Sequence, residues 1–107
     1  MKFIDLCCGI GGFHQALKNI NMKCVMACDI DKECRDIYEL NYGIKPLNNI
    51  NEIDIEKINN FDILCAGFPC QPFSKAGFQK GFDDIRSNVF CTICKIIKFH
   101  KPKYIIL

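Results

Sequence analysis

The feature that most constrains this chain is its alternation of short, nearly continuous apolar runs with amphipathic segments. The apolar runs predict strands at residues 3–7, 23–28, 61–66 and 103–107, with a weaker strand and a short helix within 46–60. Helices are expected between them, at about 13–19, from Asp31 to Gly43, and around Val89–Ile97. Apolar strands that alternate with helices are typical of a parallel sheet covered on both faces. The sequence therefore predicts an α/β fold with about five strands.

Length and composition are those of a single globular unit. The chain has 107 residues, of which 50% are hydrophobic and 24% charged, so it can bury one core and is not of the disordered class. No apolar run approaches the roughly 20 residues of a membrane span, and Asp5 interrupts the first apolar segment too early for a signal peptide. These features predict a cytoplasmic or nucleoid-associated protein without a membrane partner.

The charges are unevenly distributed along the chain. Residues 1–74 carry seven Lys and Arg against ten Asp and Glu, a net charge of −3, whereas residues 75–107 carry seven against two, a net charge of +5. An anionic partner is therefore expected to meet the C-terminal third.

The chain has nine cysteines, an odd number, and most of them lie in apolar segments. With no secretory signal, this pattern favours a reducing compartment in which cysteines act as small buried hydrophobic residues. Cys91 and Cys94 form the only C-x-x-C pair, and without a second pair or a histidine at ligand spacing it is more consistent with helix packing than with a zinc site. No metal site is predicted, although a redox or zinc protein remains an alternative.

A glycine-rich turn follows the first predicted strand and opens a helix. The segment Cys8–Gly12 carries three glycines, and Asp29 ends the next predicted strand about 20 residues later. Backbone amides approach a ligand at such a turn, and a carboxylate at the second strand can accept hydrogen bonds from ribose. His14 stands where the dinucleotide fingerprint needs its third glycine, which favours a smaller adenosyl cofactor over NAD. A turn that merely links strand and helix is the alternative.

A second loop, Gly67–Ser74, follows the strand predicted at residues 61–66. Its Cys70 lies between prolines, where regular packing is impossible, so it is a candidate nucleophile, and a buried loop cysteine is the alternative. Lys75, Lys80 and Arg86 then alternate with glycine and phenylalanine, which suits a loop that closes over a nucleic-acid backbone. On these residues alone, a solvated surface loop is equally compatible.

Together these motifs resemble the N-terminal part of the cytosine-C5 DNA methyltransferases, over the whole chain and in the same order. Phe3–Phe13 is similar to the family's S-adenosylmethionine turn, Cys28–Asp31 to its ribose-binding segment, and Phe61–Ser74 to its catalytic motif. Lys101–Leu107 resembles the strand that leads into the next motif. The resemblance implies a Rossmann-like methyltransferase sheet that stops after about five strands, with 1–107 as the N-terminal part of the catalytic domain.

The resemblance also implies a set of site residues. Cys70 is the expected catalytic nucleophile, which adds to C6 of a cytosine flipped out of double-stranded DNA. The cofactor S-adenosylmethionine is expected to meet eleven residues: Asp5, Cys7, Gly9, Ile10, Gly11, Gly12, Asp29, Ile30, Asn49, Ile50 and Pro69. The loop over the DNA is expected to use Gln71, Ser74, Lys75 and Arg86.

The chain departs from the family pattern in ways that affect these expectations. Cys7 and Ile30 stand where the family has aromatic side chains, and Asn49 where it prefers Asp, so looser cofactor binding is expected. The Glu-Asn-Val motif, the target-recognition region and the C-terminal cofactor segment do not occur in the 107 residues. We therefore expect a companion chain to supply them, within a restriction-modification system. The alternatives are an inactive fragment that binds the cofactor weakly and a transfer-RNA cytosine methyltransferase, although Gly-Phe-Pro-Cys favours the DNA enzymes.

Overall fold

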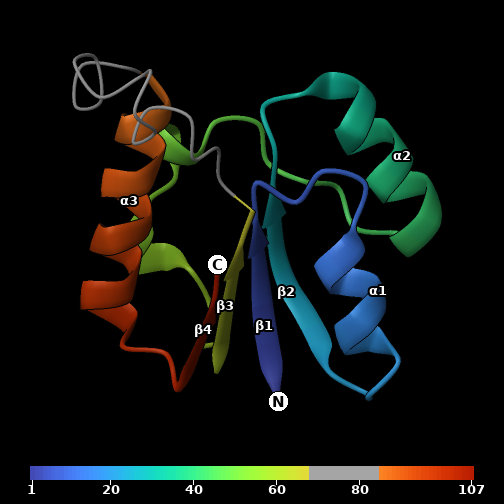
Figure 1. Cartoon of the computed structure of the whole chain (residues 1–107), viewed down its shortest axis with the longest axis horizontal. Helices are drawn as coiled ribbons and strands as arrows, with labels where there is room; N and C mark the ends of the chain where they lie inside the picture. The colour runs from blue at the N-terminus through green and yellow to red at the C-terminus, as the bar shows by residue number, and fades with distance from the viewer. Residues whose placement is uncertain (68–84) are drawn as a thin grey trace.

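The computed structural model describes residues 1–67 and 85–107, with the backbone alone for residues 85–88. Its four strands are β1 (Lys2–Leu6), β2 (Lys23–Cys28), β3 (Ile63–Ala66) and β4 (Tyr104–Ile106). Its three α-helices are α1 (Gly12–Lys18), α2 (Lys32–Tyr42) and α3 (Ile85–His100), and two 3₁₀ turns, η1 (Ile50–Glu52) and η2 (Ile55–Lys57), precede β3. Figure 1 shows the strands side by side, with their carboxyl ends at one edge of the sheet.

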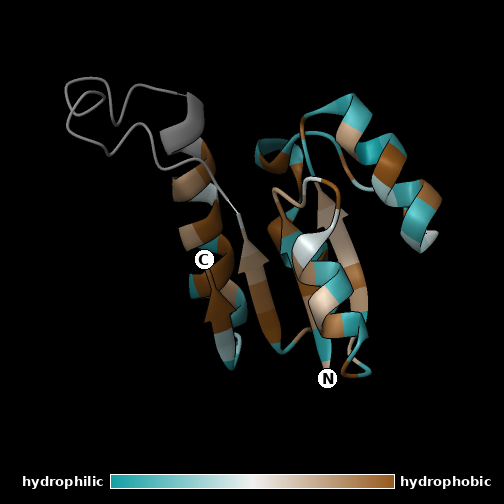
Figure 2. Cartoon of the chain, turned by 45° about the vertical axis from the view of Figure 1, so that its right-hand side comes forward, coloured by the Kyte–Doolittle hydropathy of each residue, from teal (hydrophilic) through white to brown (hydrophobic). Residues whose placement is uncertain are grey.

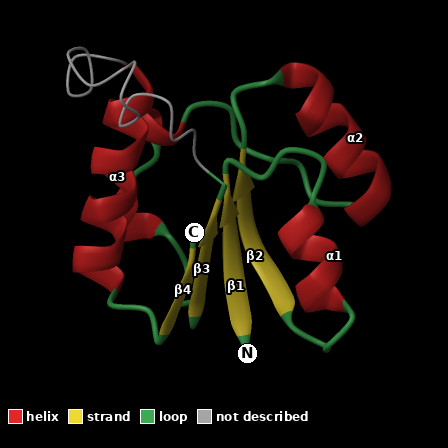
Figure 3. Cartoon of the chain, viewed as in Figure 1, coloured by secondary structure: helices red, strands yellow, loops and turns green. Residues whose placement is uncertain are grey.

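The strands form a parallel sheet in the order β2-β1-β3-β4. β1 therefore pairs on both sides, with β2 and with β3. Helices α1 and α2 lie on one side of the sheet and α3 on the other (Figure 3). This arrangement confirms the predicted α/β class and the parallel sheet. Each connection between successive strands crosses over the sheet, so that the next strand runs in the same direction as the one before it.

The predicted weak strand within 46–60 is wrong, and the described residues form four strands rather than about five. Within 46–60, Leu47 makes only an isolated bridge to Cys28. The regular structure of this segment consists of the two 3₁₀ turns η1 and η2. Asn49 and Asp54 explain the difference, because each side chain accepts a backbone N–H two residues ahead and so caps a turn.

The pleat of β1 divides the core into two clusters. Ile4 and Leu6 face the cluster that includes Ile93 and Ile96 of α3, whereas Phe3 faces the cluster with Leu17 and Tyr38. β3 and all of β1 after Lys2 are buried on both faces, which favours side chains that are almost all apolar. Figure 2 shows β3 and β4 as largely hydrophobic, while α2 mixes hydrophilic and hydrophobic residues along its length.

Helix α2 begins and ends at the predicted residues. Asp31 accepts hydrogen bonds from the backbone N–H groups of Glu33 (2.9 Å) and Cys34 (3.4 Å), which caps the first turn. Gly43 ends the helix with φ 71°, a left-handed conformation that glycine adopts without strain.

The eight cysteines among the described residues divide into three groups by exposure. Cys8, Cys24, Cys28 and Cys65 are buried, as predicted for small hydrophobic residues, and Cys7 and Cys34 are half-buried. Cys91 and Cys94 are exposed, whereas Thr92 and Ile93 between them are buried. The expectation that the C-x-x-C pair packs inside the helix interface is therefore wrong: the register of α3 turns both thiols away from the sheet.

A buried polar network lies beneath α1 and α2. Asp5 has no exposed surface, and its Oδ2 accepts a hydrogen bond of 3.2 Å from the Tyr38 hydroxyl. Nδ1 of His14 lies 2.5 Å from the same hydroxyl, and the His14 ring stacks on Tyr42 at 3.9 Å. Oδ1 of Asp5 is buried without a hydrogen-bond partner. Burial is the main reason that the pKa of Asp5 rises to about 7, and repulsion from Asp29 adds to it.

We expect Leu64→Ala to lower the free energy of unfolding by about 3 kcal/mol, because Leu64 of β3 is fully buried and the change leaves a cavity. Leu40→Ala is the matched control, since Leu40 is 85% exposed on α2 and should change stability by less than about 0.5 kcal/mol. Urea denaturation followed by circular dichroism measures both. Equal losses in the two variants would contradict the position of Leu64 in the core.

Asp5→Asn should change how stability depends on pH. The folded chain holds the Asp5 proton up to about pH 7, while the unfolded chain releases it near 3.8, the ordinary pKa of an aspartate, so this group's stabilisation is lost as pH rises between those values. The variant has no such loss. Its stability relative to the wild type should grow by on the order of 3 kcal/mol between pH 5 and pH 8 and then level off.

His14 is present in both the wild type and the variant, and burial lowers its pKa. Its contribution makes stability rise with pH, and this contribution cancels when the two proteins are compared. Urea denaturation at several pH values measures the difference. A difference that does not change with pH would show that Asp5 does not titrate in this range.

Candidate functional site

A cavity of about 380 Å³ lies where the carboxyl ends of β1, β2 and β3 meet. After β1 the chain forms β2 on one side of β1, and it later forms β3 on the other side. The strand order therefore reverses at this point of the sheet. Parallel sheets bind ligands at that point because the loops there diverge and leave a crevice. Its wall combines the ends of the strands with the 48–51 segment and one turn of α3: Cys7, Gly9, Cys28, Asp29, Ile30, Asn48, Asn49, Ile50, Asn51, Gly67 and Val89.

The turn after β1 forms one side of this cavity. Cys7 and Gly9 both have positive φ, 51° and 55°, so the backbone reverses direction immediately after the strand. The N–H of Cys8 donates to the carbonyl of Cys28 (2.9 Å), and the N–H of Gly67 donates to the carbonyl of Leu6 (3.2 Å). The three strand ends are thus tied together by backbone hydrogen bonds.

Asp29 connects the two sides of the cavity. Its Oδ2 accepts a hydrogen bond of 2.7 Å from the N–H of Gly9, and its Oδ1 accepts one of 2.8 Å from the N–H of Asp31. Each carboxylate oxygen has a further lone pair, so both can still accept from a ligand hydroxyl. Asp29 therefore orients the glycine turn and also presents negative charge to the cavity.

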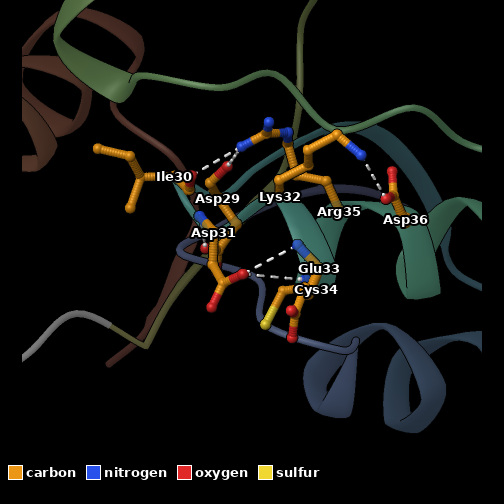
Figure 4. A network of polar contacts seen from close by, with 8 residues as sticks. All are labelled: Asp29, Ile30, Asp31, Lys32, Glu33, Cys34, Arg35 and Asp36. Carbon is orange, nitrogen blue, oxygen red and sulfur yellow. Dashed lines mark hydrogen bonds and ion pairs between the residues drawn. The ribbon is translucent and has the colours of Figure 1, made fainter.

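Arg35 holds the segment that carries Asp29. Figure 4 shows its side chain reaching back from α2 towards the chain before the helix. Its Nη1 lies within hydrogen-bond distance of the carbonyls of Asp29 (3.0 Å) and Ile30 (2.8 Å) and of Asn48 Oδ1 (3.2 Å). The guanidinium thus fixes two adjoining parts of the cavity wall. Sequence reasoning missed Arg35, although a basic residue one turn after the Asp31 cap is the signal that could have identified it.

The thiols in the cavity wall are neutral. Burial is the main reason that the pKa of Cys7 rises to about 11 and that of Cys28 to about 12, and repulsion from the Asp29 carboxylate is a smaller part of both increases. Ile30, Ile50 and Val89 add apolar surface. The site therefore offers one carboxylate within a mostly apolar wall, which suits a ligand with an apolar body and a few hydroxyl or cationic groups.

The glycines of the turn have different roles. A Cβ added at Gly9 would meet nothing within 4 Å, so the backbone there is open to a ligand. A Cβ added at Gly11 would lie 2.3 Å from the Tyr42 ring, and Gly11 has φ 101°. Gly11 is therefore required by the packing of α2 against the turn, and not by the cavity.

The cavity brings together six of the expected cofactor residues: Cys7, Gly9, Asp29, Ile30, Asn49 and Ile50. Asp5, Ile10, Gly11 and Gly12 are not part of its wall. Asp5 belongs to the buried network below α1, Ile10 is 60% exposed, and Asn49 Oδ1 already accepts from the N–H of Asn51 (2.9 Å). Sequence reasoning missed Asn48, Asn51 and Val89, which tertiary packing adds to the wall. Cys28 and Gly67 also line it, and they lie in the segments that resemble the ribose-binding and catalytic motifs.

The proposed catalytic and DNA-binding positions lie mostly outside the described residues. Pro69, Cys70, Gln71, Ser74 and Lys75 all fall there, and of Arg86 only the backbone in α3 is described. Their roles stay predictions. Within the described residues no cluster of three or more metal-binding side chains occurs, and no helix there is long and apolar enough to cross a membrane.

Comparison with known proteins gives consistent relatives. The family model for C-5 cytosine-specific DNA methylases matches residues 1–107. The chain is 44% identical over 107 residues to the type II methyltransferase M.HhaI of Haemophilus parahaemolyticus, covering 100% of the chain and 33% of that relative. It is 46% identical over 110 residues to M1.ScrFI of Lactococcus lactis subsp. cremoris, covering 99% of the chain and 28% of that relative.

Solved structures agree with these relatives. The S. pombe Dnmt2 methyltransferase superposes with a TM-score of 0.79 at 30% identity, over 98% of this chain and 34% of that one. The Entamoeba histolytica methyltransferase EhMeth gives a TM-score of 0.78 at 25% identity, over 96% of this chain and 35% of that one. The chain thus spans about a third of the length of its relatives. Because the family model matches every residue from Met1 to Leu107, the chain belongs to the C-5 cytosine-specific DNA methylase family.

Proposed function

We propose that this chain supplies the cofactor-binding part and the nucleophile of an enzyme that methylates C5 of cytosine in double-stranded DNA. The observation that carries the proposal is the cavity at the ends of β1, β2 and β3, where Asp29 and the open backbone at Gly9 face an apolar wall. Membership of the family and the type II methyltransferase relatives support the reaction class.

The cavity fits S-adenosylmethionine in its chemistry. Asp29 can accept hydrogen bonds from the ribose hydroxyls, and its negative charge favours a ligand that carries a positive sulfonium centre. Ile30, Ile50 and Val89 give the adenine ring apolar neighbours. When bound, the cofactor supplies the reactive methyl group. The protein residues hold and orient it.

Cys70 is the nucleophile in this proposal. Its thiolate adds to C6 of the cytosine, which makes C5 able to take the methyl group; loss of the C5 proton and elimination of the thiol then restore the ring. Cys70 follows Gly67, which lines the cavity, by three residues in the sequence, and this separation supports the proposed role. The base must leave the duplex to reach this position.

The segment 71–86 is proposed to meet the DNA. Gln71, Ser74, Lys75 and Arg86 lie in it, and residues 75–107 carry the net charge of +5. Positive charge in this region would bind the phosphate backbone without reading sequence. A restriction-modification system is the proposed setting, since the relatives are type II methyltransferases.

Methyl transfer is proposed to need residues beyond these 107, from the same polypeptide or from a companion chain. The chain spans about a third of its relatives, and β4 pairs with β3 on one side only within the described residues. Ile105, Ile106 and Leu107 are exposed there. An exposed apolar edge strand is a site for pairing with further strands, which supports this requirement.

Asp29→Ala should weaken S-adenosylmethionine binding by about 10- to 100-fold, because it removes the acceptor for ribose and releases the Gly9 turn. Isothermal titration calorimetry on the whole chain measures the change. The control is Asp36→Ala, which removes an exposed carboxylate of α2 that pairs only with Lys32. If both variants bind as the wild type does, the cofactor does not occupy this cavity.

Cys70→Ser should abolish methyl transfer to cytosine in DNA while cofactor affinity stays within about twofold. Transfer of labelled methyl groups is measured with the complementing residues of a full-length relative present. Cys34→Ser is the control, because Cys34 lies on α2 outside the cavity wall. Retained activity in Cys70→Ser would contradict the nucleophile. Transfer to transfer RNA but not to DNA would favour the RNA alternative, and activity of the 107 residues alone would contradict the requirement for further residues.

A further inference from the structure

The exposed pair Cys91 and Cys94 is not used by the proposed methyl transfer. Both thiols are exposed on α3, while Thr92 and Ile93 of the same turn are buried against the rest of the fold. Thr92 donates a hydrogen bond to Asn51 Oδ1, which fixes which side of α3 faces the core. Because residues three apart on a helix lie on the same side, the two thiols are neighbours on the outer surface. The helix presents a preformed dithiol to solvent.

The charge around this dithiol differs from that around the other described cysteines. Burial raises the pKa of Cys7 and Cys28, and carboxylates raise it further. Helix α3 contains no Asp or Glu, and the exposed Lys95 and Lys98 lie on the same outer side as the two thiols.

The helix geometry favours a bridging atom over a disulfide. Cβ atoms three residues apart on a helix are about 5–6 Å apart, whereas a disulfide needs Cβ atoms about 3.5–4.5 Å apart. A metal ion with bonds of about 2.3 Å to each sulfur separates the two sulfurs by up to about 4.6 Å, which the helix accommodates without unwinding. An ion therefore fits where a direct S–S bond would distort α3.

We propose that Cys91 and Cys94 form a two-thiolate site for a soft monovalent cation of the Cu⁺ class. Among the common cellular metals, thiolates favour Cu⁺ and zinc, but a structural zinc ion takes four ligands. The described residues place no cluster of three or more metal-binding side chains anywhere, whereas Cu⁺ is satisfied by two thiolates. On binding, each thiol releases one proton and each sulfur forms one bond to the ion, with no change of oxidation state. The site's charge falls by one, next to Lys95 and Lys98.

The test is an anaerobic titration of the reduced whole chain with Cu⁺ held by a chromophoric chelator. The wild type should withdraw one equivalent of Cu⁺ with at least a hundredfold higher affinity than Cys91→Ser/Cys94→Ser. Each single serine variant should lose as much as the double variant, because one sulfur alone cannot hold the ion against the chelator. Equal affinity of wild type and double variant would overturn the proposal.

A spacing variant separates a shared site from a simple count of thiols. Cys94→Ser/Lys98→Cys keeps two exposed thiols on the same side of α3 but places them seven residues apart, which is about 10 Å along the helix. This variant should bind Cu⁺ as weakly as the double serine variant, and Cys34→Ser should bind as the wild type does. Wild-type affinity in the spacing variant would overturn the proposal.

Three further measurements complete the test. A Cys91–Cys94 disulfide formed under mild oxidant, with no tight Cu⁺ binding by the reduced chain, would show a redox pair instead of a metal site. Circular dichroism of all variants should match the wild type, since every substituted side chain on α3 is exposed. S-adenosylmethionine binding should be unchanged by Cu⁺, because neither thiol lines the cofactor cavity, so this test and those of the proposed function fail independently.

Discussion

The rest of this structure depends on the pairing of β1 with strands on both of its edges. β2 and β3 each hydrogen-bond to it in parallel, so the chain must emerge from all three strands at the same edge of the sheet. A parallel strand buried on both faces also has to be apolar along its length, which Phe3, Ile4 and Leu6 provide. Asp5 is the one charged side chain buried within this strand, and its burial has to be offset by Tyr38.

The cavity is a consequence of this pairing and of one carboxylate. The strand ends diverge where the order reverses, and Asp29 closes the gap by accepting the N–H of Gly9. Arg35 then holds the carbonyls of Asp29 and Ile30 from the first turns of α2. Among the described residues, the cavity wall is thus built by local contacts of short loops.

The eight cysteines that the structure describes lie in different environments. Those in the strands act as small core residues, and those beside the cavity are kept neutral by burial and by Asp29. The pair on α3 faces solvent because the helix register is set by Ile93 and Ile96, which are buried. The same residue type therefore lies in the core, in the cavity wall or on the solvent-facing surface, according to its position in the sheet or helix.

Local sequence patterns were enough to predict the fold class, most strand and helix positions, the glycine turn around Gly9 and the carboxylate of Asp29, because periodicity, capping and turn chemistry act between near neighbours. The resemblance to the methyltransferase family added Cys7, Ile30, Asn49 and Ile50, which also line the cavity. The folded chain was needed to establish that 46–60 forms 3₁₀ turns and that Gly11 serves the packing of Tyr42. It was also needed to establish that Arg35 holds the cavity wall and that both thiols of α3 face outward. Those features depend on contacts between segments that only folding brings together, which no local pattern encodes.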